Sequence, residues 1–342
     1  MHLVLRDAGR LSVSTRTLHS HAVCQWRAAW HNRIYDCGPM MRRRRARRAL
    51  WLAVAVLLWF HSAMALAQTT AQKAEAALLP TATAIQEIEI VEHNVLHRPI
   101  ELTAGHTHWI DRTYTYGGTQ QNLLPVHLGV EFVNARDTPV YAAKAGRVIF
   151  AGDDSKALIG PQLEYYGNVV ILAHDLRSLA GSQVFTLYGH LNEIHVRAGQ
   201  LVEDLERLGT IGSSGVAIGP HLHFEVRVGD ALDYKQTRNP ELWLQHYVDH
   251  GMIAGSLRNE EGEAIHGWRI TVRSDSAKRD VSTYGGGEVN SDPVWRENFT
   301  VSDLLAGEYE ILVLDESGRP AFFEIARVEP YRTTYVEITL SK

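Results

Sequence analysis

The sequence predicts a mostly β protein, in which an antiparallel β-sheet or flattened barrel is followed by a small β-sandwich. Short β-branched runs such as GRVIFAG and GNVVILAH are separated by glycines across residues 123–245. After residue 251, about seven short alternating stretches are separated by turns, which is typical of a sandwich. We expect a short closing helix at NPELWLQHYV, residues 239–248.

The N-terminal part has the order of a secretory signal peptide. A basic run, RRRRARR, is followed by an apolar run at residues 49–60 and by an Ala-x-Ala cleavage pattern that ends at Ala67. Two explanations stay open for the residues before it. Either Met40 or Met41 is the true initiator, or a cytoplasmic tail precedes an uncleaved anchor at residues 49–67, which is long enough to span a bilayer.

We therefore expect an exported protein, in the periplasm, in the cell wall or secreted, with membrane contact only through this segment if it is uncleaved. The expected parts are an extension and signal peptide or signal anchor (1–67), a linker (68–84), a catalytic domain (85–248) and a β-sandwich (251–342). The sandwich contains no histidine pair, so we expect the chemistry to be independent of it.

Charge and cysteine content exclude several functions. Residues 1–67 hold eleven arginines and two aspartates, so the rest of the chain carries −14 against −5 for the whole. Such an acidic chain argues against nucleic-acid binding. Both cysteines, Cys24 and Cys37, precede the signal, so the exported part has no disulfide and no cysteine nucleophile. A metal there would be bound by nitrogen and oxygen.

Three short stretches indicate a metal-dependent hydrolase. HLGVEF, LYGHL and GPHLHFEV bring five residues into about a hundred positions: His127, Glu131, His190, His221 and His223. On a strand, His221 and His223 share one face, ~6.6 Å apart. His127 and Glu131 would lie ~13 Å apart on a straight strand, so we expect Gly129 to allow a bend between them. Histidine nitrogens and a carboxylate around an open position suit catalytic zinc.

These blocks also resemble a known family. HLGVEF, DTPVYAAKAGRVIFAGDD, YYGNVVILAHD, FTLYGHL, SGVAIGPHLHFEVR and NPELW, across residues 110–245, resemble the lysostaphin-type (LytM-like) zinc endopeptidases, peptidase family M23. The resemblance implies a LytM-like β domain that cleaves peptide bonds in peptidoglycan, so that its partners are peptidoglycan peptides. It implies Zn²⁺ ligands at His127, Glu131 and His223, and catalytic histidines that are not ligands at His190 and His221. These two would act on the attacking water and on the oxyanion.

Glu131 departs from the family, which usually has aspartate at this position. Glutamate has the same charge and oxygen donors, so it suits a metal as well. Two alternatives stay open. The chain could be a catalytically weak or inactive LytM-like protein that activates another cell-wall hydrolase, although the intact histidines argue against this. It could also be a peptidase that acts on proteins outside the wall. The sequence indicates neither the bond cleaved nor the oligomeric state.

Other motifs are interpreted without a catalytic role. His106 and His108 form a second His-x-His pair with no acid at useful spacing, and His174 is interpreted as structural. Four tyrosines line a groove or pack in the core: Tyr114, Tyr116, Tyr165 and Tyr166. In the C-terminal part, LLAGEYEILV resembles carboxypeptidase-regulatory-like (transthyretin-like) domains, which implies a spacer or adhesion module.

Overall fold

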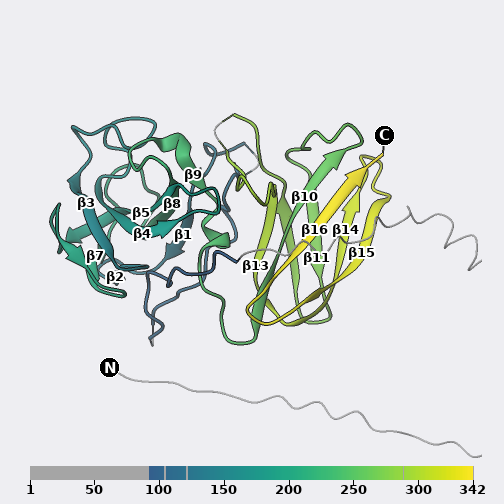
Figure 1. Ribbon diagram of the computed structural model, residues 1–342, viewed down its shortest axis with the longest axis horizontal. Helices are drawn as coiled ribbons and strands as arrows, with labels where there is room; N and C mark the ends of the chain where they lie inside the picture. The colour runs from purple at the N-terminus through teal and green to yellow at the C-terminus, as the bar shows by residue number, and fades with distance from the viewer. Residues whose placement is uncertain (1–91, 104, 121, 288, 342) are drawn as a thin grey trace, which may run out of the picture. The chain divides into compact units, whose positions relative to one another are not determined.

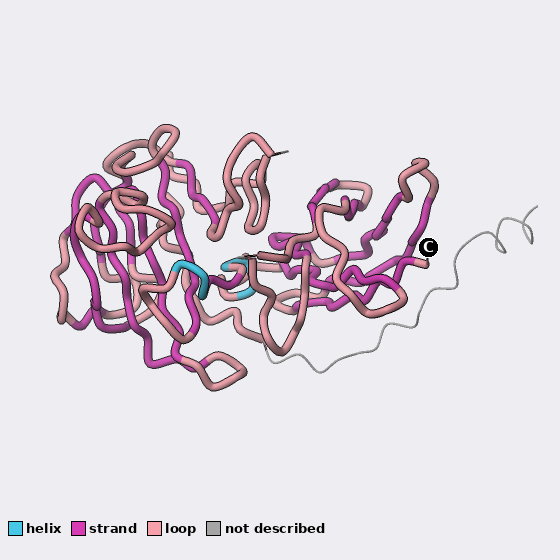
Figure 2. The backbone as a smooth tube through the Cα atoms, turned by 90° about the horizontal axis from the view of Figure 1, so that it is seen from above, coloured by secondary structure: helices cyan, strands magenta, loops and turns pink. Residues whose placement is uncertain are grey.

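The computed structural model describes residues 92–341 except for 104, 121 and 288 (Figure 1). The signal segment and the linker therefore lie outside the described residues. Within the described residues, no helix has the length and apolar character needed to cross a membrane. Strands dominate the backbone, and its helical parts are short turns (Figure 2). The predicted mostly β fold is confirmed.

The first part of the described chain forms a nine-stranded sheet (Figure 1). Its strands are β1 (Val130–Val133), β2 (Pro139–Tyr141), β3 (Gly146–Asp153), β4 (Asn168–Arg177), β5 (Gln183–Ile194), β6 (Leu201–Val202), β7 (Arg207–Ile211), β8 (His221–Val228) and β9 (Thr237–Arg238). The order is β1-β8-β5-β4-β3-β6, while β7 pairs with β5 and β2, and β9 pairs with β8. Every pairing in this sheet is antiparallel. The strand β8 thus lies between β1 and β5.

Alternate residues of the central strands pack on opposite faces of the sheet. On β4, Val170 and Leu172 join the larger core, whereas Val169 and Ile171 join a second cluster on the other side. Every residue of β8 is buried. A strand with both faces covered is rigid, and such strands hold side chains more exactly than loops do.

Residues 239–248 do not form the predicted closing helix. They contain a single 3-10 turn, η2 (Pro240–Leu242), whose start is capped by Asn239. A similar turn, η1 (Tyr234–Gln236), precedes β9. After η2 the chain runs beside Leu96, which forms a bridge with Leu244 and accepts a hydrogen bond from the amide of Gln245. The helix prediction was wrong because a pairing far along the sequence takes up these backbone groups.

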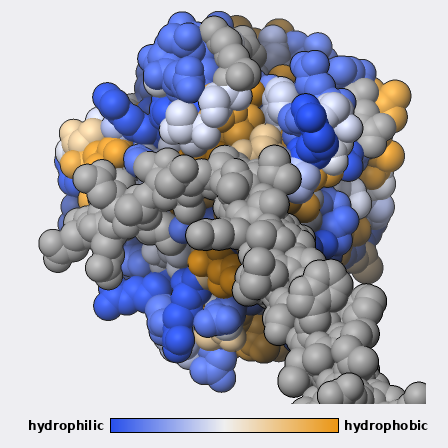
Figure 3. Space-filling view, turned by 90° about the vertical axis from the view of Figure 1, so that its right-hand side faces the viewer, coloured by the Kyte–Doolittle hydropathy of each residue, from blue (hydrophilic) through white to orange (hydrophobic). Residues whose placement is uncertain are grey.

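The C-terminal part forms two sheets that share one core, which we call the C-terminal sandwich. Its strands are β10 (His250–Asn259), β11 (Arg269–Arg273), β12 (Lys278–Ser282), β13 (Phe299–Leu305), β14 (Gly307–Leu314), β15 (Pro320–Val328) and β16 (Thr333–Leu340). The orders are β13-β10-β16 and β12-β11-β14-β15. Apolar residues from both sheets fill the space between them. On the face turned to the viewer in Figure 3, the coloured residues are largely hydrophilic, with apolar ones in separate groups.

All described residues belong to one compact unit. The stretch that leads into β1 contacts both the nine-stranded sheet and the C-terminal sandwich. The His93 ring stacks on Trp243, with ring centres 4.1 Å apart, and lies 5.6 Å from the Trp295 ring of the sandwich. His93 also pairs with buried Asp292. The sandwich is therefore packed against the rest of the described chain through buried side chains.

Candidate metal centre

Three of the predicted site residues meet at the junction of β1 and β8. Glu131 on β1 lies opposite His223 on β8 in the strand register, and His127 comes just before β1. Ligand atoms of the three side chains all lie within 4.8 Å of one another. His127 Nε2 is 3.2 Å from His223 Nδ1 and 3.7 Å from Glu131 Oε1. The structure thus brings together two imidazole nitrogens and a carboxylate.

Gly129 allows this close approach. The backbone bends at Gly129, so Glu131 lies on the strand while His127 lies outside it. A Cβ atom at residue 129 would be 2.7 Å from both His223 Nε2 and the Phe224 carbonyl oxygen. Only glycine leaves room there for the ring of the facing strand.

The four histidines of the site share one arrangement, in which one ring nitrogen donates to an oxygen that can only accept. The pairs are His127 Nδ1 with Tyr114 O (2.7 Å), His190 Nδ1 with Ser214 O (2.8 Å), His221 Nδ1 with Gly219 O (3.1 Å) and His223 Nε2 with Glu225 Oε1 (3.0 Å). Because carbonyl and carboxylate oxygens accept, each of these nitrogens carries the proton of the neutral ring. The second nitrogen of each ring is then a bare acceptor.

This donor set fits a cation. His127 Nε2 and His223 Nδ1 both present lone pairs at 3.2 Å, with Glu131 Oε1 beside them. Burial and the neighbouring His223 hold the pKa of His127 well below its usual value, which opposes protonation as a source of positive charge. Among the described residues, the buried Nε2 of His221 has no hydrogen-bond partner, and it lies 3.4 Å from Glu131 Oε1. Two imidazoles with a carboxylate are ligands that zinc accepts.

His190 and His221 adjoin this group, with ring centres 4.9 Å apart. His190 has a φ of 61°, which is uncommon for a residue other than glycine. It lies where the pairing of β5 with β4 shifts register, so a bulge turns its side chain. Burial lowers the pKa of His190 to about 3 and also lowers that of His221. Both rings are therefore neutral at neutral pH.

Behind His223 lies a buried polar group that our sequence analysis missed. Glu225 accepts hydrogen bonds from His223 Nε2 and, at 2.7 Å, from Arg227 Nε, and it also bonds the Tyr166 hydroxyl. All of these side chains are buried. Burial alone would raise the pKa of Glu225, but Arg227 and His223 lower it to about 2, so the carboxylate is charged. The alternation in HLHFEVR, which places 221, 223, 225 and 227 on one face, was the available signal.

Tyr114 is the second residue whose role the sequence did not reveal. Its ring stacks on His127, with centres 4.0 Å apart and planes inclined by 7°. Tyr116 and Tyr166 are buried. The other histidines that the sequence analysis considered lie elsewhere: His174 bonds Thr186 and Ala145, His106 bonds Thr103, and His108 packs on Tyr247.

Residues 125–239 match the model of peptidase family M23. Over 102 residues, the chain is 34% identical to the peptidoglycan DD-endopeptidase ShyA of Vibrio cholerae, and over 103 residues it is 33% identical to the DD-carboxypeptidase/endopeptidase Mpg of Neisseria meningitidis. Each match covers 30% of this chain and 20% of the relative. A solved structure of a zinc containing peptidase from Vibrio cholerae is 28% identical, covering 41% of this chain and 40% of that one, with a TM-score of 0.31. The chain thus spans about a fifth of the length of these curated relatives. The family match and the relatives together support a peptidase family M23 domain in residues 125–239 of this chain.

Proposed function

We propose that this chain is a zinc-dependent peptidase that hydrolyses peptide bonds in peptidoglycan. The observation that carries the proposal is the meeting of two bare imidazole nitrogens and a carboxylate beside two further neutral histidines. The family match supports a peptidase. Two relatives whose names specify a peptidoglycan DD-endopeptidase and a DD-carboxypeptidase/endopeptidase support the substrate class.

In this proposal His127, Glu131 and His223 hold the zinc ion. A zinc ion held there would supply the Lewis acidity that polarises the carbonyl group of the peptide bond. Through a bare Nε2 atom, His221 accepts a proton from the attacking water, with the neutral ring of His190 beside it. Once protonated, such a ring donates a hydrogen bond to the oxyanion or a proton to the leaving nitrogen.

The proposal also covers location and organisation. Peptidoglycan lies outside the cytoplasmic membrane, and the basic, apolar and small-residue pattern before residue 68 supports export of the chain. We further propose that residues 85–248 are the peptidase domain and that residues 251–342 are a carboxypeptidase-regulatory-like sandwich. A non-enzymatic activator is not favoured, because all five side chains are present and lie close together.

The experiment compares four single variants of the full chain for bound zinc and for release of peptides from purified peptidoglycan. We expect His223→Ala to lose both zinc and activity. His190→Ala and His221→Ala should keep zinc and lose activity by a factor on the order of a hundred or more. His106→Ala is the control, because His106 bonds Thr103 in a part-exposed position and does not belong to the ligand group.

A wild-type protein that binds no zinc after zinc is supplied would end the proposal. Loss of zinc from His221→Ala but not from His223→Ala would reverse the assigned roles. If the protein binds zinc and cleaves exported proteins but not peptidoglycan, the alternative of a peptidase that acts on proteins outside the wall would be favoured.

A further inference from the structure

Residues 111–118, which we call the holding segment, contact the candidate ligand His127 from three sides. The amide of Gly117 donates to the His127 carbonyl (2.7 Å), and the His127 amide donates to the Gly118 carbonyl (3.0 Å). The Tyr114 carbonyl accepts a hydrogen bond from His127 Nδ1, and the Tyr114 ring stacks on the His127 ring. The place of this segment therefore sets both the backbone and the ring orientation of His127. Its first amide, that of Asp111, also donates to the carbonyl of the second ligand residue, Glu131 (2.8 Å).

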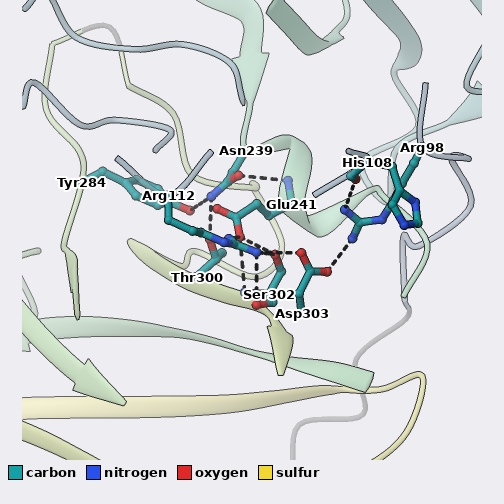
Figure 4. Close-up of polar contacts among 9 residues, drawn as sticks. All are labelled: Arg98, His108, Arg112, Asn239, Glu241, Tyr284, Thr300, Ser302 and Asp303. Carbon is teal, nitrogen blue, oxygen red and sulfur yellow. Dashed lines mark hydrogen bonds and ion pairs between the residues drawn. The ribbon is translucent and has the colours of Figure 1, made fainter. Parts of the chain in front are cut away.

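The C-terminal sandwich binds the holding segment through Arg112 (Figure 4). The Arg112 guanidinium binds Asp303 Oδ2 of β13 at 2.7 Å and Ser302 Oγ at 3.0 Å. Its other terminal nitrogen binds Glu241 Oε2, in η2, at 2.7 Å. The side chains of Glu241 and Asp303 are only 2% and 10% exposed. One guanidinium thus joins the holding segment, η2 and the sandwich in a largely desolvated group, where removal of one partner is costly.

An apolar contact holds the other end of the segment. Tyr116 and Tyr284 of the sandwich pack edge to face, with ring centres 5.3 Å apart, and Leu128 joins them in a buried cluster. Leu128 directly follows His127 in the chain. The Tyr116 hydroxyl donates to the Asn290 carbonyl at 3.1 Å. A Cβ atom on Gly117 would overlap the side chain of Tyr284, so the two segments of the chain approach as closely as glycine allows.

We propose that the C-terminal sandwich is a positioning element of the metal centre, which fixes the holding segment and, through it, the orientation of His127. The inference rests on the proposed function in so far as His127 is a zinc ligand. Arg112, Tyr116 and Tyr284 are positioning residues, since none of them belongs to the ligand group. The sandwich is then a working part of the site, in place of the independent module that we expected from the sequence.

The test uses the full chain with Arg112→Ala, and with Arg98→Ala as a matched control. Arg98 binds the same carboxylate, Asp303, but lies outside the holding segment (Figure 4). The dissociation constant for zinc is measured by competition with a chelator. Backbone hydrogen exchange of the holding segment and His127 is measured in the metal-free protein. Loss of groups that orient ligands usually weakens metal binding roughly 10–100-fold.

We expect Arg112→Ala to weaken zinc binding by roughly that factor and to speed exchange at Gly117 and His127. Arg112→Lys should recover part of both, and Arg98→Ala should change neither by more than about twofold. A folded Arg112→Ala protein with wild-type zinc affinity and exchange would overturn the inference. If Arg112→Ala does not fold, Tyr116→Phe decides in the same assays, because it removes only a hydroxyl group.

The two proposals fail separately. A chain that binds zinc but leaves peptidoglycan intact refutes the proposed function. In that case the zinc affinities of the variants still test whether the sandwich positions the metal centre. If the wild-type protein binds no zinc, exchange in the metal-free protein still shows whether the sandwich orders the holding segment.

Discussion

Replacing Glu225 by glutamine should lower both the stability of the fold and the zinc affinity, and the two effects can be measured separately. Glu225 is fully buried and lies between His223 Nε2 at 3.0 Å and Arg227 Nε at 2.7 Å. The amide of glutamine has one acceptor and one donor end, whereas both neighbours are donors. One neighbour must therefore meet an N–H group.

The magnitude follows from these two contacts. Breaking a buried ion pair by removing one partner costs about 3–5 kcal/mol, because Arg227 keeps its charge without a counter-charge. If the amide nitrogen faces His223, the ring proton moves to Nδ1, the atom that faces His127. Zinc binding should then weaken roughly 10–100-fold, or about 1.4–2.7 kcal/mol.

Urea unfolding of the metal-free protein measures the first effect, and chelator competition measures the second. The double variant with Arg227→Met removes the unpaired charge, so we expect it to regain stability. A folded Glu225→Gln protein with the zinc affinity of the wild type would refute the role of Glu225 in orienting His223.

Four further changes test other parts of the structure. Gly129→Ala should displace the His223 ring and weaken zinc binding measured by chelator competition; unchanged affinity would show that the strands can move apart. Glu131→Asp shortens the ligand by ~1.5 Å and should also weaken zinc binding, roughly tenfold or more; tighter binding would point to a degenerate site. Leu205 is half exposed and has a φ of 60°, a left-handed conformation that strains leucine. Leu205→Gly should therefore raise the unfolding free energy measured in urea by about 0.5–1 kcal/mol; a variant less stable than the wild type would contradict this. Burial raises the pKa of Glu297 to about 8, so the folded state keeps a proton that the unfolded state loses above its ordinary pKa of 4.5. The unfolding free energy should therefore fall as the pH rises between these two values, by the order of a few kcal/mol. If the unfolding free energy of a Glu297→Gln variant falls by the same amount, the protonation of Glu297 is not the cause.

Several features of the site were readable from the residues alone. The bend at Gly129 follows from the distance that a straight strand imposes between His127 and Glu131. The structure has this bend, and it brings the two side chains to 3.7 Å. The third candidate, His223, could be placed on one face with His221 because alternation is a local property of any strand.

Other features had no local signal. The closing helix failed because Leu96, far back in the chain, pairs with the residues after η2. The bulge that turns His190 arises from the register between β4 and β5, which neither strand's own sequence specifies.

The sequence by itself determined that this chain is mostly β and which five side chains could share a metal site, since strand periodicity and residue chemistry are written locally along the chain. The tertiary structure alone decided which ring nitrogens face one another, because each proton position depends on an acceptor such as the Tyr114 carbonyl or Glu225. It alone decided that the sandwich contacts the segment that holds His127. The contact between Arg112 and Ser302 joins residues 190 positions apart, and no pattern within either segment encodes a contact of that range.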